Sequence, residues 1–454
     1  MKMLVSRWLG SLEATIARFE RRLIYLIFAA ATLLQLDAIL HHGYMGQDYG
    51  TSAEAAARAI QLPAPRWIVY VGTNTPAMFW LAAFVHWATG SASYIAVTSF
   101  FFAVASTVAL YVWWLLAKAT IGEATLRVAA MLTLSFLPVR LIHSVVYAGD
   151  AVVVLPFTLV VWFSYELFRA TDRHKQRRLA VALSAALVAG IFSKFTTASA
   201  VPIELLLLLV CSRNFRAHKD LVATLVLIVI VPACLAVFYQ HVYSHLPDTD
   251  GRRIFWGHDM SWRSLLMLRA ADVDVLKAPL YLDVLASNQH SYPGLLHYSI
   301  FTDPLNIFQY DPSDSYFGVR PKAYQHLMTF AVRWAVPLSL VMIGAAAAYS
   351  VRAIFYLRAL REGFVDRRLP TLLVLFLSLA FFANIAVVLP FVQRAYYFGY
   401  WTSRLVLPAL LGFGLLAFAL LDARLRWRGA RLAVLAYCIV HATVNARFLW
   451  MRGD

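Results

Sequence analysis

The chain has 454 residues, of which 61% are hydrophobic and only 14% are charged, and its mean hydropathy is +0.66. A soluble core does not need that much apolar surface, so the composition excludes an ordinary soluble domain and indicates a polytopic membrane protein. The formal net charge of +16 does not indicate a nucleic-acid partner, because Lys and Arg gather at the ends of apolar segments and form no basic groove with interleaved aromatic residues.

The first residues, 1–22, mix apolar and basic side chains. The basic residues are Lys2, Arg7, Arg18, Arg21 and Arg22. This pattern predicts an amphipathic helix on the cytoplasmic membrane surface. No cleavage site made of small residues follows, so we do not expect a removable signal peptide.

Eleven apolar segments follow, and a helix of about 20 residues spans the roughly 30 Å hydrocarbon layer. We expect transmembrane helices at residues 23–40, 95–117, 126–147, 151–168, 179–193, 197–211, 221–240, 329–351, 370–390, 402–421 and 430–448. The sequence therefore predicts an all-α fold with about 11 transmembrane helices. It divides into a module at 23–240 and C-terminal helices at 329–454.

The connections between these segments carry positive charge on alternate sides. Lys and Arg gather near 169–178, 213–219, 352–368 and 424–431. The short turns near 148–150, 194–196 and 391–401 hold only Lys194 and Arg394. Because basic loops stay on the cytoplasmic side, we expect a cytoplasmic N-terminus, with these short turns on the outer face.

Two outer regions are longer than simple connectors. The first, 41–94, contains EAAARAIQ and PAMFWLAAFVHWATG. The second of these stretches is expected to be an interfacial helix, because a full crossing there would invert the charge bias downstream. The second region, 241–328, is polar and aromatic and predicts an ordered external cap.

The candidate site residues lie at the outer ends of the segments. Asp48 follows the first segment in HHGYMGQDYG, beside His42 and Tyr49. An acid at a membrane boundary is usually retained for chemistry or transport, and this one suits a general base. The alternative is a solvated loop acid or the N-cap of the following helix.

A second acid and a lysine occupy two further outer turns. Asp150 opens the fourth segment in YAGDAVVVLP, where an N-cap is the alternative to a functional role. Lys194 lies in GIFSKFTTASAVP. Its ammonium can bind a phosphate oxygen, or it can extend to the outer interface as a surface lysine.

Arg394 and Arg404 flank the stretch QRAYYFGYWTSRLVLP, which includes Tyr397 and Tyr400. Guanidinium groups bind phosphate in a bidentate manner, and tyrosines line sugar sites or form an interfacial belt. Four further ionisable residues are expected to be partnered within helices and rank below the others: Asp37, Arg140, His143 and Glu204.

No His, Cys and carboxylate cluster has metal-ligand spacing. Cys211, Cys234 and Cys438 are isolated and are expected to be small apolar residues. We therefore expect no required cofactor and no metal site, although Asp48 and Asp150 could share a divalent ion if they lie close together.

In their order along the chain these features resemble the GT-C superfamily of integral-membrane glycosyltransferases. The branch of protein O-mannosyltransferases and the lipid A aminoarabinose transferase is the most similar. The resemblance rests on GQDYG, TNTPAMFWLAAFVHWATG, YAGDAVVVLP, GIFSKFTT and SRLVLP, and covers residues 20–240 and, more loosely, 390–415. It departs at Tyr49, which replaces a second acid, and at Asn74 and Thr75, which replace a basic residue and a proline. GQDYGTSAEAA is also similar to mannosyltransferases of mycobacterial type, so the branch stays open.

The resemblance implies an enzyme that moves a sugar, with inversion, from a polyprenyl-phosphate donor to a lipid, glycan or protein acceptor outside the cytoplasm. In that interpretation Asp48 is the base and Asp150 its carboxylate partner. Lys194, Arg404 and Arg394 contact the donor phosphate, and the substrate-binding residues are Tyr49, His42, Tyr397 and Tyr400. A bacterial inner-membrane location is implied. The alternatives are a transporter or lipid flippase, which needs ionisable groups near the membrane midplane, and an inactive scaffold, in which the acids and lysine do not converge.

Overall fold

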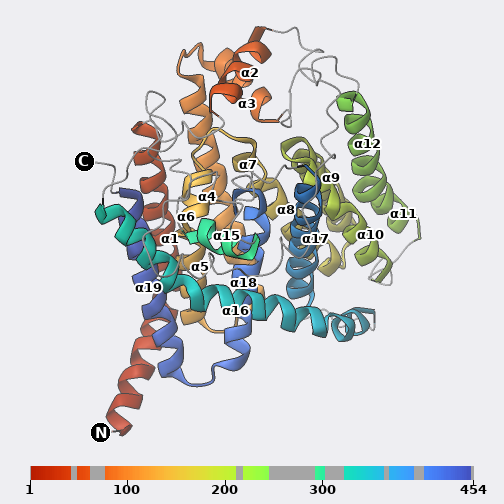
Figure 1. Cartoon of the computed structure of the whole chain (residues 1–454). Helices are drawn as coiled ribbons and strands as arrows, with labels where there is room; N and C mark the ends of the chain where they lie inside the picture. The colour runs from red at the N-terminus through yellow and green to blue at the C-terminus, as the bar shows by residue number, and fades with distance from the viewer. Residues whose placement is uncertain are drawn as a thin grey trace.

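The structure, a computed structural model, describes residues 2–41, 49–61, 77–210, 218–244, 292–301, 322–361, 368–392 and 403–450. These ranges consist of helices and turns and contain no strand (Figure 1). The predicted all-α membrane fold is confirmed. Asp48 and most of the outer region 241–328 lie outside the described residues.

Each of the eleven predicted segments contains helix among its described residues. In the first half of the chain they correspond to α1 (Lys2–Leu40), α4 (Tyr94–Thr120), α5 (Ala124–Ser135), α6 (Pro138–His143), α7 (Gly149–Val152), α8 (Val154–Arg169) and α9 (Arg173–Ser193). The later ones are η2 (Phe195–Ser199), α10 (Ala200–Val210), α11 (His218–Leu225), η4 (Val226–Ile230), α12 (Val231–Ser244), α16 (Lys322–Arg361), α17 (Arg368–Val392), η8 (Ser403–Val406), α18 (Leu407–Arg424) and α19 (Arg428–Trp450).

Eight of the described helices are long and apolar enough to cross a membrane, where the sequence predicted eleven crossings. These eight are Arg7–Leu40, Tyr94–Thr120, Gly149–Arg169, Arg173–Ser193, His326–Ala359, Arg368–Ile385, Arg404–Arg424 and Arg428–Arg447. The other three predicted crossings are interrupted. Pro138 ends α5 because it has no N–H to donate and disfavours helical geometry in the residue before it. A 3₁₀ turn precedes α10, and a π-helical turn precedes α12.

The predicted surface helix 1–22 is not a separate element. Residues from Lys2 to Leu40 form one continuous helix of 39 residues, and the tip of its N-terminal half extends beyond the rest of the bundle in Figure 1. The apolar residues of that half continue the helix into the first crossing, since no Gly or Pro separates the two parts. Glu13 and Glu20 tie this half to the bundle through Arg431, at 2.9 Å, and Arg127, at 2.5 Å.

The first outer region contains two described helices, α2 (Tyr49–Gln61) and α3 (Ala77–Thr89). With 13 residues, α3 is about 20 Å long, too short to cross the roughly 30 Å layer. It packs between α2 and α4 and also contacts α7. Met78 and Phe79 of α3 are buried in a cluster with Ala56 of α2 and Phe102 of α4. The two described helices of this region, α2 and α3, are therefore fixed to the end of the bundle where α7 lies.

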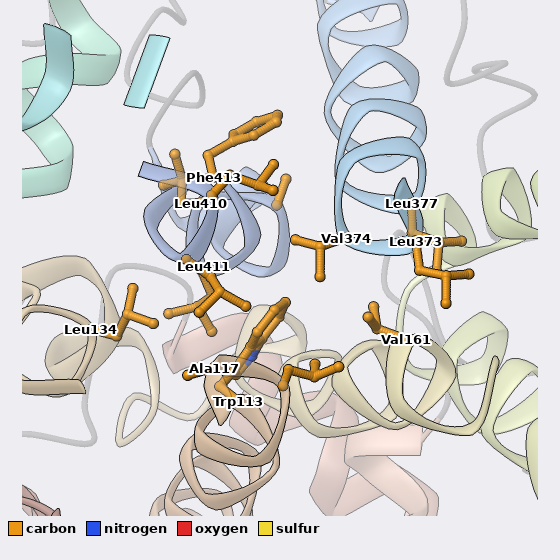
Figure 2. Packing of buried hydrophobic residues seen from close by; sticks show 14 of the residues in the cluster. Trp113, Ala117, Leu134, Val161, Leu373, Val374, Leu377, Leu410, Leu411 and Phe413 are labelled. Atoms are coloured by element: carbon orange, nitrogen blue, oxygen red, sulfur yellow. The ribbon is translucent and has the colours of Figure 1, made fainter. Parts of the chain in front are cut away.

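The centre of the bundle is a close packing of α4, α5, α8, α17 and α18 (Figure 2). Trp113 and Ala117 of α4 face Leu411 of α18, and Leu134 of α5 lies beside them. Val374 of α17 approaches from the other side. Helices in lipid associate through such van der Waals packing rather than through exclusion of water.

One helix of the second outer region is described, α15 (Tyr292–Phe301), and it packs against α16, α6 and η8. His297 is held by α16 through two contacts, from Nε2 to the Val332 carbonyl at 3.2 Å and from Nδ1 to Ser339 Oγ at 2.8 Å. Phe301 meets the ring of His441 on α19 edge to face, with ring centroids 5.5 Å apart. This part of the region is ordered against the bundle. Residues 241–244 and 322–328 of the predicted cap belong to α12 and α16, and its other residues lie outside the described ranges.

Candidate active site

Asp150 lies in α7, the single helical turn between α6 and α8. It is buried, with 8% of its surface exposed. The N-cap of α7 is Ala148, and no side chain caps the helix. The alternative role of Asp150 as an N-cap is therefore wrong, and its carboxylate is directed to tertiary partners.

The first partner is Lys194, whose Nζ donates to Asp150 Oδ1. Lys194 ends α9 with an extended backbone, and η2 begins at the next residue. Its side chain is only 17% exposed, so it does not extend to the outer interface. Burial lowers the pKa of the Lys194 ammonium below its usual value, and the neighbouring Asp150 carboxylate opposes that shift.

The second partner is Arg404, the second residue of η8, whose Nε lies 3.5 Å from Asp150 Oδ2. Arg404 is 4% exposed, and η8 packs against both α6 and α17. A carboxylate thus separates two cations, each opposite one of its oxygens. Asp150, Lys194 and Arg404 are far apart in sequence but form one buried cluster. Their catalytic and binding roles stay predictions.

His143 belongs to this cluster as well, although sequence reasoning ranked it as an interior helix residue. It ends α6, is 5% exposed, and interacts electrostatically with Arg404, Asp150 and Lys194. A sequence signal exists in retrospect. His143 comes just before the short turn that carries Asp150, at the outer end of an apolar segment.

Several predicted site residues are not placed. Asp48, His42, Arg394, Tyr397 and Tyr400 lie outside the described residues. Tyr49 begins α2, but the position of its side chain is not described. The predicted convergence of Asp48 with Asp150 therefore stays a prediction.

Two of the ionisable residues assigned to helix interiors are partnered there, as predicted. Arg140 is fully buried and donates to Ser106 Oγ at 3.0 Å and to the Ser135 carbonyl at 2.8 Å. Glu204 is also fully buried and accepts from Ser164 Oγ at 2.5 Å. Both side chains link neighbouring helices.

Within the described part of the chain no group of three His, Cys, Asp or Glu side chains could hold a metal ion. The Asp150 carboxylate already faces two cations, which would repel a divalent ion at close range. A metal shared with Asp48 would have to displace at least one of these contacts. That shared-metal hypothesis stays a prediction.

No family model matches the chain, and no curated protein matches it in sequence. The solved structures similar to it include the protein O-mannosyltransferase Pmt1-Pmt2 complex of S. cerevisiae bound to the sugar donor. That match has 14% identity and a TM-score of 0.41, and covers 56% of this chain and 37% of that one. ArnT of Cupriavidus metallidurans bound to undecaprenyl phosphate is 15% identical with a TM-score of 0.48, over 92% of this chain and 63% of that one.

The apo state of the same ArnT is matched at 14% identity with a TM-score of 0.38, over 88% of this chain and 76% of that one. The matches with Pmt1-Pmt2 and with ArnT bound to undecaprenyl phosphate thus cover less than two thirds of those chains. The predicted resemblance is borne out to this extent: the structures found are of the two kinds that the order of the motifs indicated. At these identities and TM-scores, the functional assignment depends on the residues of the site.

Proposed function

We propose that this protein is a membrane glycosyltransferase that moves a sugar from a polyprenyl-phosphate donor to an acceptor on the outer side of the membrane. The observation that carries the proposal is the buried cluster in which Asp150 holds Lys194 and Arg404. The three side chains come from three connections predicted to lie at the outer ends of crossings. Such a cluster is poorly explained as a support for folding, because replacing a buried ion pair by apolar residues is often neutral or stabilising.

The cluster suits a phosphate that gains charge. When the acceptor hydroxyl attacks the anomeric carbon of the donor, a bond from its oxygen to that carbon forms. The bond from the anomeric carbon to the phosphate oxygen breaks, and its electron pair stays on the phosphate. The ammonium group of Lys194 and the guanidinium group of Arg404 together offer up to eight N–H donors. Cations fixed before the reaction stabilise developing charge without reorganisation.

In this proposal Asp150 is a positioning residue for both cations. One of its oxygens faces Lys194 and the other faces Arg404, so one carboxylate fixes the spacing of both groups. Asp48 is the general base that removes the proton of the acceptor hydroxyl. Attack from the face opposite the phosphate gives inversion.

The remaining roles follow the predicted positions in the chain. Arg394 is a further phosphate contact, and His42, Tyr49, Tyr397 and Tyr400 contact the sugar or the acceptor. The apolar bundle and the surrounding membrane lipids accommodate the prenyl tail. The acceptor is a lipid, glycan or protein on the outer side of a bacterial inner membrane, and no metal is required.

Some observations favour the alternative, a transporter or lipid flippase. Arg140 and Glu204 are fully buried ionisable residues in apolar helices, and α5 and α12 adjoin breaks in helical geometry. Transporters use such features at binding sites near the membrane midplane. Here both residues have neutral hydrogen-bond partners in neighbouring helices, which also accounts for their burial. A flippase would move lipid between leaflets without forming a glycosidic bond.

The proposal is tested by incubating the purified full chain with a panel of polyprenyl-phosphate sugars and acceptor extracts, and measuring release of polyprenyl phosphate. Asp48→Asn is expected to lower turnover by at least about 10²-fold, the scale of general-base catalysis, with unchanged thermal unfolding. Asp37→Asn is the matched control, since Asp37 is a partly exposed acid near the end of α1 that pairs with His41. Near-normal turnover of Asp48→Asn would refute the assignment of the base. Release by neither wild type nor variants, together with lipid movement across vesicles, would support the flippase.

A further inference from the structure

His143 is the member of the cluster for which the fold provides no hydrogen-bond partner at Nδ1. The ring is 5% exposed, and its Nδ1 atom is buried without a hydrogen bond. Leaving a buried polar atom without a partner costs free energy, because the atom loses its hydrogen bonds to water and gains none in return. Unpaired atoms of this kind in native structures call for a specific explanation.

The surroundings of His143 point to an anion rather than a structural partner. The residue ends α6, which packs against η8, the element that carries Arg404, and against α15. The charged groups that interact with its ring are Arg404, Asp150 and Lys194. By contrast, Arg140 on the same short helix donates hydrogen bonds to protein groups, namely Ser106, Ser135 and Gln35.

The ring has one N–H to donate. Next to two fixed cations and removed from water, a third positive charge would be repelled and poorly solvated, so the imidazole is neutral. A neutral imidazole carries one N–H donor and one acceptor nitrogen, and the tautomer adapts to the partner that is present. Opposite a phosphate oxygen, the nitrogen that faces the phosphate carries the hydrogen.

We propose that His143 is a substrate-contacting residue that donates a hydrogen bond to the phosphate group of the lipid-linked donor, beside Lys194 and Arg404. The inference rests on the proposed function and deepens it by assigning a third, uncharged donor to the phosphate. As the bond between the anomeric carbon and the phosphate oxygen breaks, the electron pair moves onto the phosphate and this hydrogen bond strengthens. His143 keeps its proton throughout, and the proton of the acceptor goes to the base. The residue therefore acts on the transition state more than on the bound donor.

The test compares His143→Leu with His143→Gln in the full chain. Leucine removes the donor, and we expect kcat to fall by about 10²-fold, as for loss of one donor to a developing oxyanion, with KM changed by less than threefold. Glutamine retains an N–H donor and is expected to recover most of kcat. Binding of undecaprenyl phosphate should weaken for His143→Leu more than for His143→Gln, since the product carries the full phosphate charge.

The matched control is His441→Leu. His441 is likewise buried, and its Nδ1 has no hydrogen bond. It lies on α19, however, and contacts Tyr437, Asn445 and Phe301. It should alter thermal unfolding while leaving kcat within a few fold. Equal losses of kcat in His143→Leu and His143→Gln, or a wild-type kcat in His143→Leu, would overturn the donor role.

The pH dependence of kcat separates a neutral donor from a general acid. A neutral donor predicts the same profile between pH 6 and 8.5 for wild type and His143→Gln. A change of kcat with pH that the wild type shows and His143→Gln does not would overturn the proposal in favour of proton transfer by His143. If the wild type turns over a lipid-phosphate sugar and the His143 variants match it, this inference alone fails. If the wild type consumes no such donor, the proposed function fails.

Discussion

At the scale of single residues, the arrangement around Asp150 sets what each substitution should do. A buried carboxylate shared by two cations is sensitive to the loss of one member, because the others are then left as uncompensated buried charges. Removing Asp150 brings Lys194 and Arg404 into mutual repulsion. Removing Lys194 leaves Asp150 still paired with Arg404 at 3.5 Å. Substitutions of Lys194 are therefore better probes of phosphate binding than substitutions of Asp150.

The burial of Lys194 leads to a prediction about pH. Burial lowers the pKa of its ammonium, and Asp150 only partly offsets this. Phosphate binding requires the protonated form, so kcat/KM should fall as pH rises through the lowered pKa, below the value of about 10.4 for a free lysine. Lys194→Arg keeps the charge at all accessible pH values, and we expect its alkaline limb to move to higher pH.

The measurement is kcat/KM for donor consumption between pH 7 and 10.5 in wild type and Lys194→Arg, with thermal unfolding checked at each pH. If kcat/KM falls over the same alkaline pH range in both proteins, the positive charge that phosphate binding requires is not that of Lys194. If the fall in kcat/KM moves to higher pH in Lys194→Arg while thermal unfolding stays unchanged, that charge is assigned to Lys194.

What the sequence could predict at this scale is the identity of the residues but not their pairing. Asp150, Lys194 and Arg404 each stood out as charges at the ends of apolar segments, and each had an ordinary alternative. The cluster depends on tertiary contacts between residues 44 and 254 positions away from Asp150, and local patterns carry no information on such contacts. The N-cap alternative for Asp150 failed because α7 begins one residue earlier, at Gly149.

At the scale of elements, close approach between helices decides how far the bundle tolerates substitution. Gly412 of α18 faces α17. A Cβ at Gly412 would clash with Ser378 Oγ and lie 3.1 Å from Ser378 Cβ and 3.3 Å from Val374 Cγ1. Small residues at such positions let helices in lipid pack closely. We expect Gly412→Ala to destabilise the protein by about 1–3 kcal/mol, the usual cost of overpacking.

Gly344→Ala is the matched control. Gly344 is exposed on α16, and a Cβ there would meet no atom within 4 Å. Alanine gains up to about 1 kcal/mol of helix propensity over glycine. Thermal unfolding in one detergent should therefore fall for Gly412→Ala and stay equal or rise for Gly344→Ala. A fall of equal size in both variants would argue against close packing at Gly412.

The positions of the elements were well predicted, whereas their interruptions were not. Hydropathy is continuous across 126–147, but Pro138 divides that segment into α5 and α6. The division has a consequence for the site, because α6 carries His143 toward η8. The charge pattern of residues 1–22 predicted a separate surface helix. These residues are instead the first part of α1, because no proline interrupts the helix before the first crossing.

At the scale of the whole molecule, the charges of the chain are distributed between two ends of the bundle. Glu13 pairs with Arg428 and Arg431, and Arg431 also pairs with Glu123. Asp422 accepts from the backbone of residues 122 and 123. These contacts join α1, α4, α5, α18 and α19 at the end predicted to be cytoplasmic. The Asp150 cluster lies at the other ends of its helices, as alternating charge predicts.

The proposed orientation leads to a prediction about access from outside. Ala92 is exposed in the turn between α3 and α4, and Trp427 is 70% exposed between α18 and α19. In a background with Cys211, Cys234 and Cys438 replaced by alanine, we expect a membrane-impermeant maleimide to label Ala92→Cys in right-side-out membranes. Trp427→Cys should be labelled only after the membrane is opened, because the basic residues beside it hold that connection on the cytoplasmic side. The reverse pattern would place the Asp150 cluster on the cytoplasmic face, where an outer acceptor could not reach it. Equal labelling of the two variants before the membrane is opened would mean that the two turns do not lie on opposite sides.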